Sequence, residues 1–237
     1  MSDSEKERLQ LIFNKHSEEY HELVVAEDWE GNLPRALREI TSFSGKTVVE
    51  LGAGTGRITM IVAPWAEKVL AFDTSQHMID KAAANVESRA LGNVTLGIAD
   101  NKKIPLPDCS ADIVIEGWSF GFSVSHGQSQ WRNEADALIA ECERLLRPGG
   151  TLIIIETLGI GSRMPSAPGA VLPVFYGYIE RQLGFASRWI RTDYRFPSIA
   201  DARRLIELFF GSMMDYVLVE GRQVVIPECT GIWWKVY

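Results

Sequence analysis

The stretch TVVELGAGTGR, residues 47–57, places three glycines within five positions directly after a run of β-branched residues. A fixed glycine loses more backbone entropy than any other residue, so such a group needs a structural reason. Residues 46–51 predict a buried strand and residues 55–65 predict a helix. The glycines therefore lie in a turn between strand and helix, where backbone amides and a helix N-terminus can approach a ligand closely.

Short strands and helices alternate along the rest of the chain. Strands rich in Val, Ile and Leu, each followed by a helix, predict right-handed crossovers and a doubly wound, mostly parallel α/β sheet with helices on both faces. The segments at 213–221 and 229–237 predict a final antiparallel pair, which brings the sheet to seven strands. The other strands are expected at 68–73, 93–100, 111–117 and 151–157, and the helices at 75–90, 131–146 and 198–210.

We interpret residues 1–237 as a single domain of four parts. Residues 1–44 are expected to form a helical lid, and residues 45–157 a ligand-binding core. Residues 158–197 interrupt the alternation with glycines, prolines and aromatic residues, and are interpreted as an inserted lid. Residues 198–237 are expected to supply the last helix and the antiparallel end of the sheet.

The overall charge argues against a polyanionic partner. The formal net charge is −7 and the isoelectric point about 5.2, so neither broad nucleic-acid binding nor binding to an anionic membrane is expected. The first ten residues are charged and have no apolar signal-peptide core, and apolar runs such as TLIII are too short to cross a bilayer. Three scattered cysteines suggest a reducing compartment, so we expect a cytoplasmic protein.

An acidic residue follows the glycine turn at the distance that nucleotide sites require. Asp73 ends the next strand, 21 residues after Gly52, where a carboxylate typically accepts both hydroxyls of a ribose. Its alternative role, stabilising the following helix N-terminus, fits the pattern less well. Dinucleotide sites prefer G-x-G-x-x-G, whereas Glu50 precedes a G-x-G-x-G pattern here. A carboxylate at that place suits an ammonium or sulfonium better than a pyrophosphate.

Several motifs in order resemble those of class I S-adenosylmethionine-dependent methyltransferases, over roughly residues 12–157. VVELGAGTG resembles the family's E/D-x-G-x-G-x-G motif, and VLAFDTSQHMIDKA resembles its acid followed by S-x-x-M. IADNKKIPLPDCSADIVI, ECERLLRPGGTLIII and IFNKHSEEY resemble three further motifs. The resemblance is to the small-molecule enzymes similar to the ubiquinone and menaquinone biosynthesis group. Asn101 and Ala111 depart from the family pattern, which has alanine and an aromatic residue there.

The resemblance implies S-adenosylmethionine as cofactor and a role for each matching residue. Glu50 and the backbone of Gly52, Ala53 and Gly54, with Gly56 completing the turn, would lie near the methionine part. Asp73 would hold the ribose, and Thr74 and Met78 would flank the adenine. The remaining implied positions are Asp100 at the adenine amino group, Asn101 beside it, Glu116 and Gly117 beside the sulfonium, and Tyr20 in the donor lid.

The acceptor side is less defined by the sequence. His126 has a suitable intrinsic pKa for a general base but equally fits an exposed loop histidine. Glu156 either faces the pocket or closes its strand, and the pair Arg144 and Arg147 reads as a solvated helix end. No His, Cys or Asp cluster has metal-ligand spacing. Two sets stay open between acceptor site and ordinary structure: the aromatic residues Trp118, Phe120, Phe122, Trp131, Phe175, Tyr176, Tyr178 and Trp189, and the polar residues Arg188, Arg191 and Asp193.

The predicted function is methyl transfer to O, N or C of a small-molecule acceptor, which leaves S-adenosylhomocysteine. A non-catalytic binding module with this fold and a dinucleotide-dependent oxidoreductase are the alternatives, and a protein or RNA methyltransferase is a third. The acidic composition argues against RNA. The sequence determines neither the acceptor nor the oligomeric state.

Overall fold

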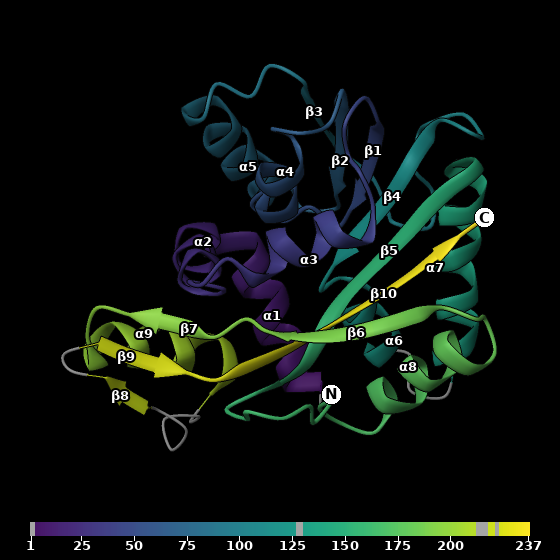
Figure 1. Cartoon of the computed structure of the whole chain (residues 1–237). Helices are drawn as coiled ribbons and strands as arrows, with labels where there is room; N and C mark the ends of the chain where they lie inside the picture. Colours follow the sequence, from purple (N-terminus) through teal and green to yellow (C-terminus); the bar gives the residue numbers. More distant parts are fainter. Residues whose placement is uncertain (1–2, 127–129, 212–217, 221–222) are drawn as a thin grey trace.

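The computed structural model describes residues 3–126, 130–211, 218–220 and 223–237. Its main sheet has seven strands in the order β3-β2-β1-β4-β5-β10-β6 (Figure 1). β10 runs antiparallel to both of its neighbours, and the other strands are parallel to one another. The predicted doubly wound sheet with an antiparallel C-terminal strand is confirmed. The strands are β1 (Thr47–Leu51), β2 (Lys68–Asp73), β3 (Val94–Ile98), β4 (Ala111–Gly117), β5 (Leu146–Ile160), β6 (Ala186–Arg191) and β10 (Glu228–Val236).

Both faces of the sheet are covered, because successive residues of its central strands point to opposite faces. Val49 and Leu51 belong to one buried cluster, which α6 (Phe120–His126), α7 (Trp131–Leu145) and α8 (Val171–Arg181) complete. Val48 belongs to the cluster on the other face, beneath α3 (Asn32–Ile40) and α4 (Arg57–Val62). α5 (Gln76–Ser88) packs beside β2 and β3. Its N-cap Ser75 accepts a hydrogen bond from the Met78 amide, as its sequence predicts.

A third buried cluster lies at the carboxyl ends of the parallel strands. It joins α1 (Asp3–Lys15) and α2 (Ser17–Ala26) to α9 (Ile199–Phe210) and to a small sheet of order β7-β9-β8. Figure 1 shows this small sheet and α9 together at one side of the molecule, next to α1. The N-terminal helices are therefore held by a unit from the far end of the chain. Its strands are β7 (Tyr194–Phe196), β8 (Leu218–Glu220) and β9 (Gln223–Ile226).

Residues 158–197, interpreted as an inserted lid, contain a strand of the main sheet that the sequence did not predict. β6 lies within that range and forms an edge of the main sheet, where its residue Trp189 pairs with Gly231. Most side chains of β6 are exposed or half-buried, so the strand lacks the apolar alternation that marks a core strand. The segment that departs from the strand–helix alternation is the later one, from β7 to β9.

Two further expectations about the strands were wrong. The described strand within 213–221, β8, pairs with β9 and not with β10, which inserts between β5 and β6. The strand expected at 151–157 begins earlier, because α7 ends at Leu145 and β5 starts directly after it at Leu146. Hydrogen bonds from the Gly149 amide to the Tyr237 carbonyl (2.5 Å) and from the Tyr237 amide to the Gly150 carbonyl (3.0 Å) hold this segment to the end of β10.

Candidate functional site

A cavity of about 660 Å³ opens at the carboxyl ends of β1, β2, β4 and β5, where ligands of open α/β sheets bind. Its volume lies within the range of about 300–1,000 Å³ that is common for small-molecule sites. Gly56 and Glu116, both described by the structure, do not line it. Eleven of the thirteen predicted cofactor-binding residues do: Tyr20, Glu50, Gly52, Ala53, Gly54, Asp73, Thr74, Met78, Asp100, Asn101 and Gly117.

The glycine turn owes its composition to backbone geometry and to one close protein contact. Gly52, Gly54 and Gly56 all have positive φ, between 53° and 86°, which favours glycine. A Cβ on Gly52 would lie 2.4 Å from the Cβ of Ser119, so the group that approaches this glycine is a side chain of the protein. Gly56 is the N-cap of α4 and sits against Ala82. The fold itself therefore requires glycine at these positions, and the lack of side chains also leaves space for a ligand.

Asp73 is anchored by the backbone but keeps free acceptor capacity. Its Oδ2 accepts a hydrogen bond from the Gly54 amide and its Oδ1 one from the Ser75 amide, each at 2.8 Å. A carboxylate offers about four lone-pair positions, so acceptor capacity remains beyond these backbone amides. Burial raises the pKa of Asp73 above its ordinary value. The group is thus placed to receive two neighbouring hydroxyls without losing its own support.

Glu50 is a buried carboxyl group beside the turn. Only 1% of it is exposed, and the Thr59 hydroxyl donates a hydrogen bond to its Oε2. Burial raises the pKa of Glu50 to about 8, and the nearby charge of Asp73 acts in the same direction. A cation next to Glu50 would favour its ionised form, because opposite charges stabilise one another at short range. The carboxyl group therefore suits the ammonium or sulfonium of a ligand.

The loop after β3 lines the cavity through Asp100 and Asn101. Asp100 Oδ1 accepts a hydrogen bond from the Lys102 amide (2.8 Å), and the Asn101 side chain donates to the Ser119 hydroxyl (3.3 Å). Asn101 Oδ1 is buried without a hydrogen-bond partner. Met78, from α5, is buried and lines the same cavity. The cavity thus offers both polar and apolar groups, as a purine base requires.

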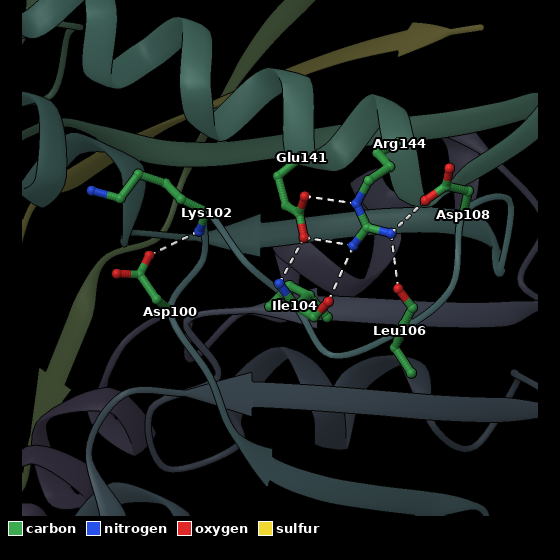
Figure 2. Close-up of polar contacts among 7 residues, drawn as sticks. All are labelled: Asp100, Lys102, Ile104, Leu106, Asp108, Glu141 and Arg144. Carbon is green, nitrogen blue, oxygen red and sulfur yellow. Dashed lines mark hydrogen bonds and ion pairs between the residues drawn. The ribbon is translucent and has the colours of Figure 1, made fainter.

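Arg144 holds this loop in place by hydrogen bonds. This corrects the interpretation of Arg144 as a solvated cation at the helix end. Figure 2 shows its guanidinium between Glu141 on α7 and the loop segment 104–108. It donates to both carboxylate oxygens of Glu141 (2.7 and 2.8 Å) and to Asp108 (2.8 Å). It also donates to the carbonyls of Leu106 (2.8 Å) and Ile104 (3.1 Å). Arg147 likewise donates to Asp112 (2.9 Å). Each of the two arginines therefore binds a particular carboxylate and is more than a solvated charge at the helix end.

The N-terminal helices cover the glycine turn. The Tyr20 ring lies 5.7 Å from that of Phe13 and 5.6 Å from that of Phe209, measured between centroids. The Ser75 hydroxyl donates to the Phe13 carbonyl (2.9 Å), which ties the cover to the start of α5. Burial raises the pKa of Tyr20 to about 12, so its hydroxyl keeps its proton at neutral pH.

Two buried carboxyl groups bind the first amides of α6. Glu116 Oε2 accepts from the Ser119 and Phe120 amides, both at 3.2 Å, and Glu156 Oε1 accepts from the Gly121 amide at 2.5 Å. Burial raises the pKa of Glu116 to about 7, and burial together with the charge of Glu116 holds the pKa of Glu156 well above its ordinary value. Of the pair, Glu156 lines the cavity. This resolves its orientation, which the sequence left open.

The other acceptor-side candidates separate into two groups. Trp118 and Phe122 line the cavity, whereas Trp189 is 44% exposed on the edge strand. His126 is the last residue of α6 and does not lie in a loop; its side chain is outside the described residues. The remaining candidates lie elsewhere: Phe120, Phe175, Tyr176 and Tyr178 in the core, Trp131 packed against that core, Arg188 bonded to Glu39, and Arg191 bonded to Asp193.

The polar residues of the cavity that the sequence did not predict include four that interact with one another or with their neighbours deep in the fold. Arg57 donates to Glu27 (2.7 Å), and its guanidinium carbon lies 4.1 Å from the Trp118 ring centroid. Glu228, at the start of β10, accepts from the Thr157 hydroxyl (2.7 Å). These residues come from distant parts of the chain, so no local spacing in the sequence predicts that they meet. They are Glu27, Arg57, Tyr194 and Glu228.

Comparison with known proteins agrees with this fold. The methyltransferase domain family matches residues 49–154. An uncharacterized methyltransferase of Schizosaccharomyces pombe is 34% identical over 196 residues, which are 77% of this chain and 71% of that protein. The demethylmenaquinone methyltransferase of Lactococcus lactis is 28% identical over 166 residues, 66% of this chain and 61% of that protein. A crystal structure of a SAM-dependent methyltransferase from Aquifex aeolicus aligns with a TM-score of 0.54 at 20% identity, covering 86% of this chain and 89% of that one.

The chain belongs to the class I S-adenosylmethionine-dependent methyltransferases. It spans 24% and 49% of the lengths of two further curated relatives. No helix in the described ranges is long and apolar enough to cross a membrane. Within those ranges, no group of three or more His, Cys, Asp and Glu side chains could hold a metal ion.

Proposed function

We propose that this protein transfers a methyl group from S-adenosylmethionine to O, N or C of a small-molecule acceptor, leaving S-adenosylhomocysteine. One observation carries the proposal. The motif residues at the ends of β1, β2 and the loop after β3 line the same cavity as the buried carboxyl, arginine and aromatic side chains farther in. One continuous cavity thus holds both the motif residues, which we call the donor half, and these inner side chains, which we call the acceptor half.

The residues of the donor half have the chemistry to bind each part of the cofactor. Asp73 has free acceptor positions for the two ribose hydroxyls, and Glu50 suits the positive charge of the methionine part. Met78 and Thr74 would flank the adenine, with Asp100 and Asn101 at its polar edge. The unpartnered Asn101 Oδ1 fits such a ligand, since a buried polar atom without a partner is unfavourable.

The cofactor carries an activated methyl group on a positively charged sulfur, so the protein has mainly to align and to exclude water. Proximity and orientation can supply about 7–11 kcal/mol of the barrier. Tyr20 and Phe13 close the donor half from the N-terminal side, and Trp118 and Phe122 line the passage to the acceptor half. We infer that residues 1–44 act as the donor lid, and that the segment from β7 to β9 bounds the acceptor half through Tyr194, Phe209 and Phe210.

An acceptor that arrives protonated needs a general base. Glu156 is the described side chain best placed for this role, because it is buried, lines the cavity and has a raised pKa. His126 remains the alternative base. We further infer a cytoplasmic protein whose acceptor is neither nucleic acid nor membrane lipid, on the acidic composition and sparse cysteines.

Calorimetric titration with S-adenosylhomocysteine tests the donor half. We expect one binding site per chain for the wild type and for Asp80→Asn, an exposed carboxylate on α5. In Asp73→Asn the amide supplies one acceptor oxygen in place of two, so a charge-assisted ribose bond is lost and affinity falls about 10- to 150-fold. Equal affinity of the two variants would exclude Asp73 as the ribose ligand. Binding of a nicotinamide dinucleotide and not of S-adenosylhomocysteine would favour the oxidoreductase alternative.

A further inference from the structure

Two buried carboxyl groups meet at the start of α6. Glu116 lies on β4 and Glu156 on β5, and the two residues are 0% and 2% exposed. Glu116 accepts hydrogen bonds from the Ser119 and Phe120 amides. Glu156 accepts one from the next amide along the chain, that of Gly121. Amides of consecutive residues lie close together, so the two carboxyl groups are neighbours. We call Glu116 and Glu156 the carboxyl pair.

The two members of the carboxyl pair differ in their access to the cavity. Glu156 lines the cavity, whereas Glu116 does not. A Cβ on Gly121 would lie 2.5 Å from Glu156 Oε2, so this position needs glycine to admit the carboxyl group. A ligand in the cavity can therefore exchange a proton with Glu156, while Glu116 acts on that exchange only through its charge.

No basic side chain neutralises the carboxyl pair. Within the described residues, the hydrogen bonds and ion pairs of Glu116 and Glu156 include none with Lys, Arg or His. Glu116 Oε1 is buried without a hydrogen-bond partner. A buried carboxylate that lacks a donor is unfavourable, and a second negative charge beside it adds repulsion. The pair therefore keeps a proton at neutral pH, in agreement with the raised pKa of both groups.

The other titratable groups around the carboxyl pair keep their charge at about pH 6. Cys142 on α7 and Tyr176 on α8 sense the charges of the pair, and burial raises the pKa of each well above its ordinary value. Both side chains therefore stay neutral. Around the start of α6, the pair is thus the group whose protonation a nearby charge can change.

The carboxyl pair adjoins the glycine turn of the donor half. The Ser119 hydroxyl donates to Glu116 Oε2 (3.0 Å), and its oxygen would lie 2.6 Å from a Cβ on Gly52. Gly117, which follows Glu116, lines the cavity together with Gly52. The methionine part of the donor is expected at this turn, which would bring its positively charged sulfur near the pair. A nearby positive charge favours the ionised form of a carboxyl group, most strongly where water is excluded.

We propose that the carboxyl pair holds a proton in the free protein and releases it to water when S-adenosylmethionine binds, because the positive charge of the ligand takes the place of that proton. Glu156 is then ionised only when the methyl donor is present. Glu116 is a positioning residue that keeps the proton on the pair until that moment. This inference rests on the proposed function and adds the step that prepares its general base.

Charge and atoms balance through the transfer. Glu156 takes the proton of the acceptor, and the acceptor lone pair forms the new bond to the methyl carbon. The C–S bond breaks with its electron pair passing to sulfur. Glu156 loses its negative charge as sulfur loses its positive charge, so the buried site has the same net charge before and after the reaction. S-adenosylhomocysteine then leaves a protein whose carboxyl pair again holds its proton.

Proton release on binding tests this inference with the wild type. S-adenosylmethionine and S-adenosylhomocysteine differ in the charge on sulfur, and both keep their α-amino group protonated at about pH 6. Glu50 and Asp73 are expected to bind parts that the two ligands share, so their contributions cancel in the comparison. Calorimetric titration in phosphate and in imidazole buffer, whose ionisation enthalpies differ, counts the protons. We expect S-adenosylmethionine to release about 0.5–1 proton more than S-adenosylhomocysteine.

Two results of this titration have different meanings. Equal proton release by the two ligands would overturn the inference and leave the proposed function standing. Failure of both ligands to bind would contradict the proposed function itself. Because the measurement needs no variant, it does not depend on whether a substituted protein folds.

Glu116→Gln separates the positioning role of Glu116 from a purely structural one. In the wild type, the affinity for S-adenosylmethionine relative to S-adenosylhomocysteine should rise with pH by up to about tenfold per unit, since less proton has to be released. The variant keeps an oxygen for the Ser119 amide but removes the charge that holds the proton on Glu156. We expect the rise to move about one pH unit or more lower, with affinity for S-adenosylhomocysteine unchanged.

Two further variants complete this experiment. Glu67→Gln, at an exposed position, is the matched control and should follow the wild type. Glu156→Gln should remove most of the rise, because the group that ionises toward the cavity is lost. A rise at the same pH in Glu116→Gln as in the wild type would contradict the role of Glu116, and an undiminished rise in Glu156→Gln would place the released proton elsewhere and overturn the inference.

Discussion

Replacing Gly52 by alanine tests the conclusion that a protein side chain, Ser119, requires glycine in the turn. Gly52 and Gly45 have the same φ of +68°, but a Cβ on Gly45 would have no atom within 4 Å. Gly45→Ala therefore isolates the cost of the left-handed backbone, about 1–2 kcal/mol. Gly52→Ala adds a Cβ 2.4 Å from that of Ser119, and such overpacking costs about 1–3 kcal/mol more. We expect losses in unfolding free energy of about 1–2 kcal/mol for Gly45→Ala and about 2–5 kcal/mol for Gly52→Ala.

Urea unfolding measures both values, and a third variant separates their causes. Adding Ser119→Gly to Gly52→Ala removes the clash, so the double variant should be more stable than the sum of the single changes predicts. Gly92→Ala, where φ is not positive and no atom lies within 4 Å, is the control for added methyl groups and should change stability little. Equal losses for Gly52→Ala and Gly45→Ala would refute the reasoning, because the contact with Ser119 would then contribute nothing.

Substitutions at three further residues test the parts of the site. Arg144→Lys loses the planar fork that joins Glu141 to the loop of residues 104–108; we expect a loss of about 1–3 kcal/mol in urea unfolding and weaker binding of S-adenosylhomocysteine. Glu50→Gln removes a carboxyl group whose folded pKa is about 8, against about 4.3 when unfolded, so between pH 5 and 7 the wild type should lose on the order of 2 kcal/mol relative to the variant. Tyr20→Ala should weaken binding of S-adenosylhomocysteine by removing the ring over the glycine turn, whereas Tyr20→Phe should retain it because the ring remains.

The sign for Glu50 follows from proton binding. Its raised pKa means that the folded state binds more protons than the unfolded state between the two pKa values, so stability falls as pH rises through this window. Urea unfolding at pH 5 and pH 7 checks the difference. Parallel losses in the wild type and Glu50→Gln would place the titration elsewhere. Unchanged stability and affinity in Arg144→Lys, or equal affinity in the two Tyr20 variants, would contradict those assignments.

The sequence predicted the donor half because its signals are local. The turn at residues 52–56, the acid that ends β2 and the loop after β3 are each read from a few consecutive residues. Strand order at the ends of β1 and β2 then brings these groups together, since carboxyl ends of parallel strands share one edge. With Tyr20 from α2 and Met78 from α5, these groups account for the eleven of thirteen predicted residues that line the cavity.

The rest depends on long-range contacts that no local pattern records. β6 was missed because an exposed edge strand lacks an apolar period. Arg144 was taken for a solvated cation because its partners lie 36 to 40 residues away, apart from Glu141 one turn earlier. The buried carboxyl groups of the cavity come from three regions of the chain, so only the folded chain brings Glu27, Glu156 and Glu228 to one cavity.

A crystal structure of the protein with S-adenosylhomocysteine bound would test the central claim most directly. We expect the ribose hydroxyls within hydrogen-bonding distance of the Asp73 carboxylate, the amino-acid ammonium beside Glu50 and the sulfur facing the side of the cavity that holds Glu156. A ligand bound elsewhere, or in this cavity with its ribose away from Asp73, would contradict it.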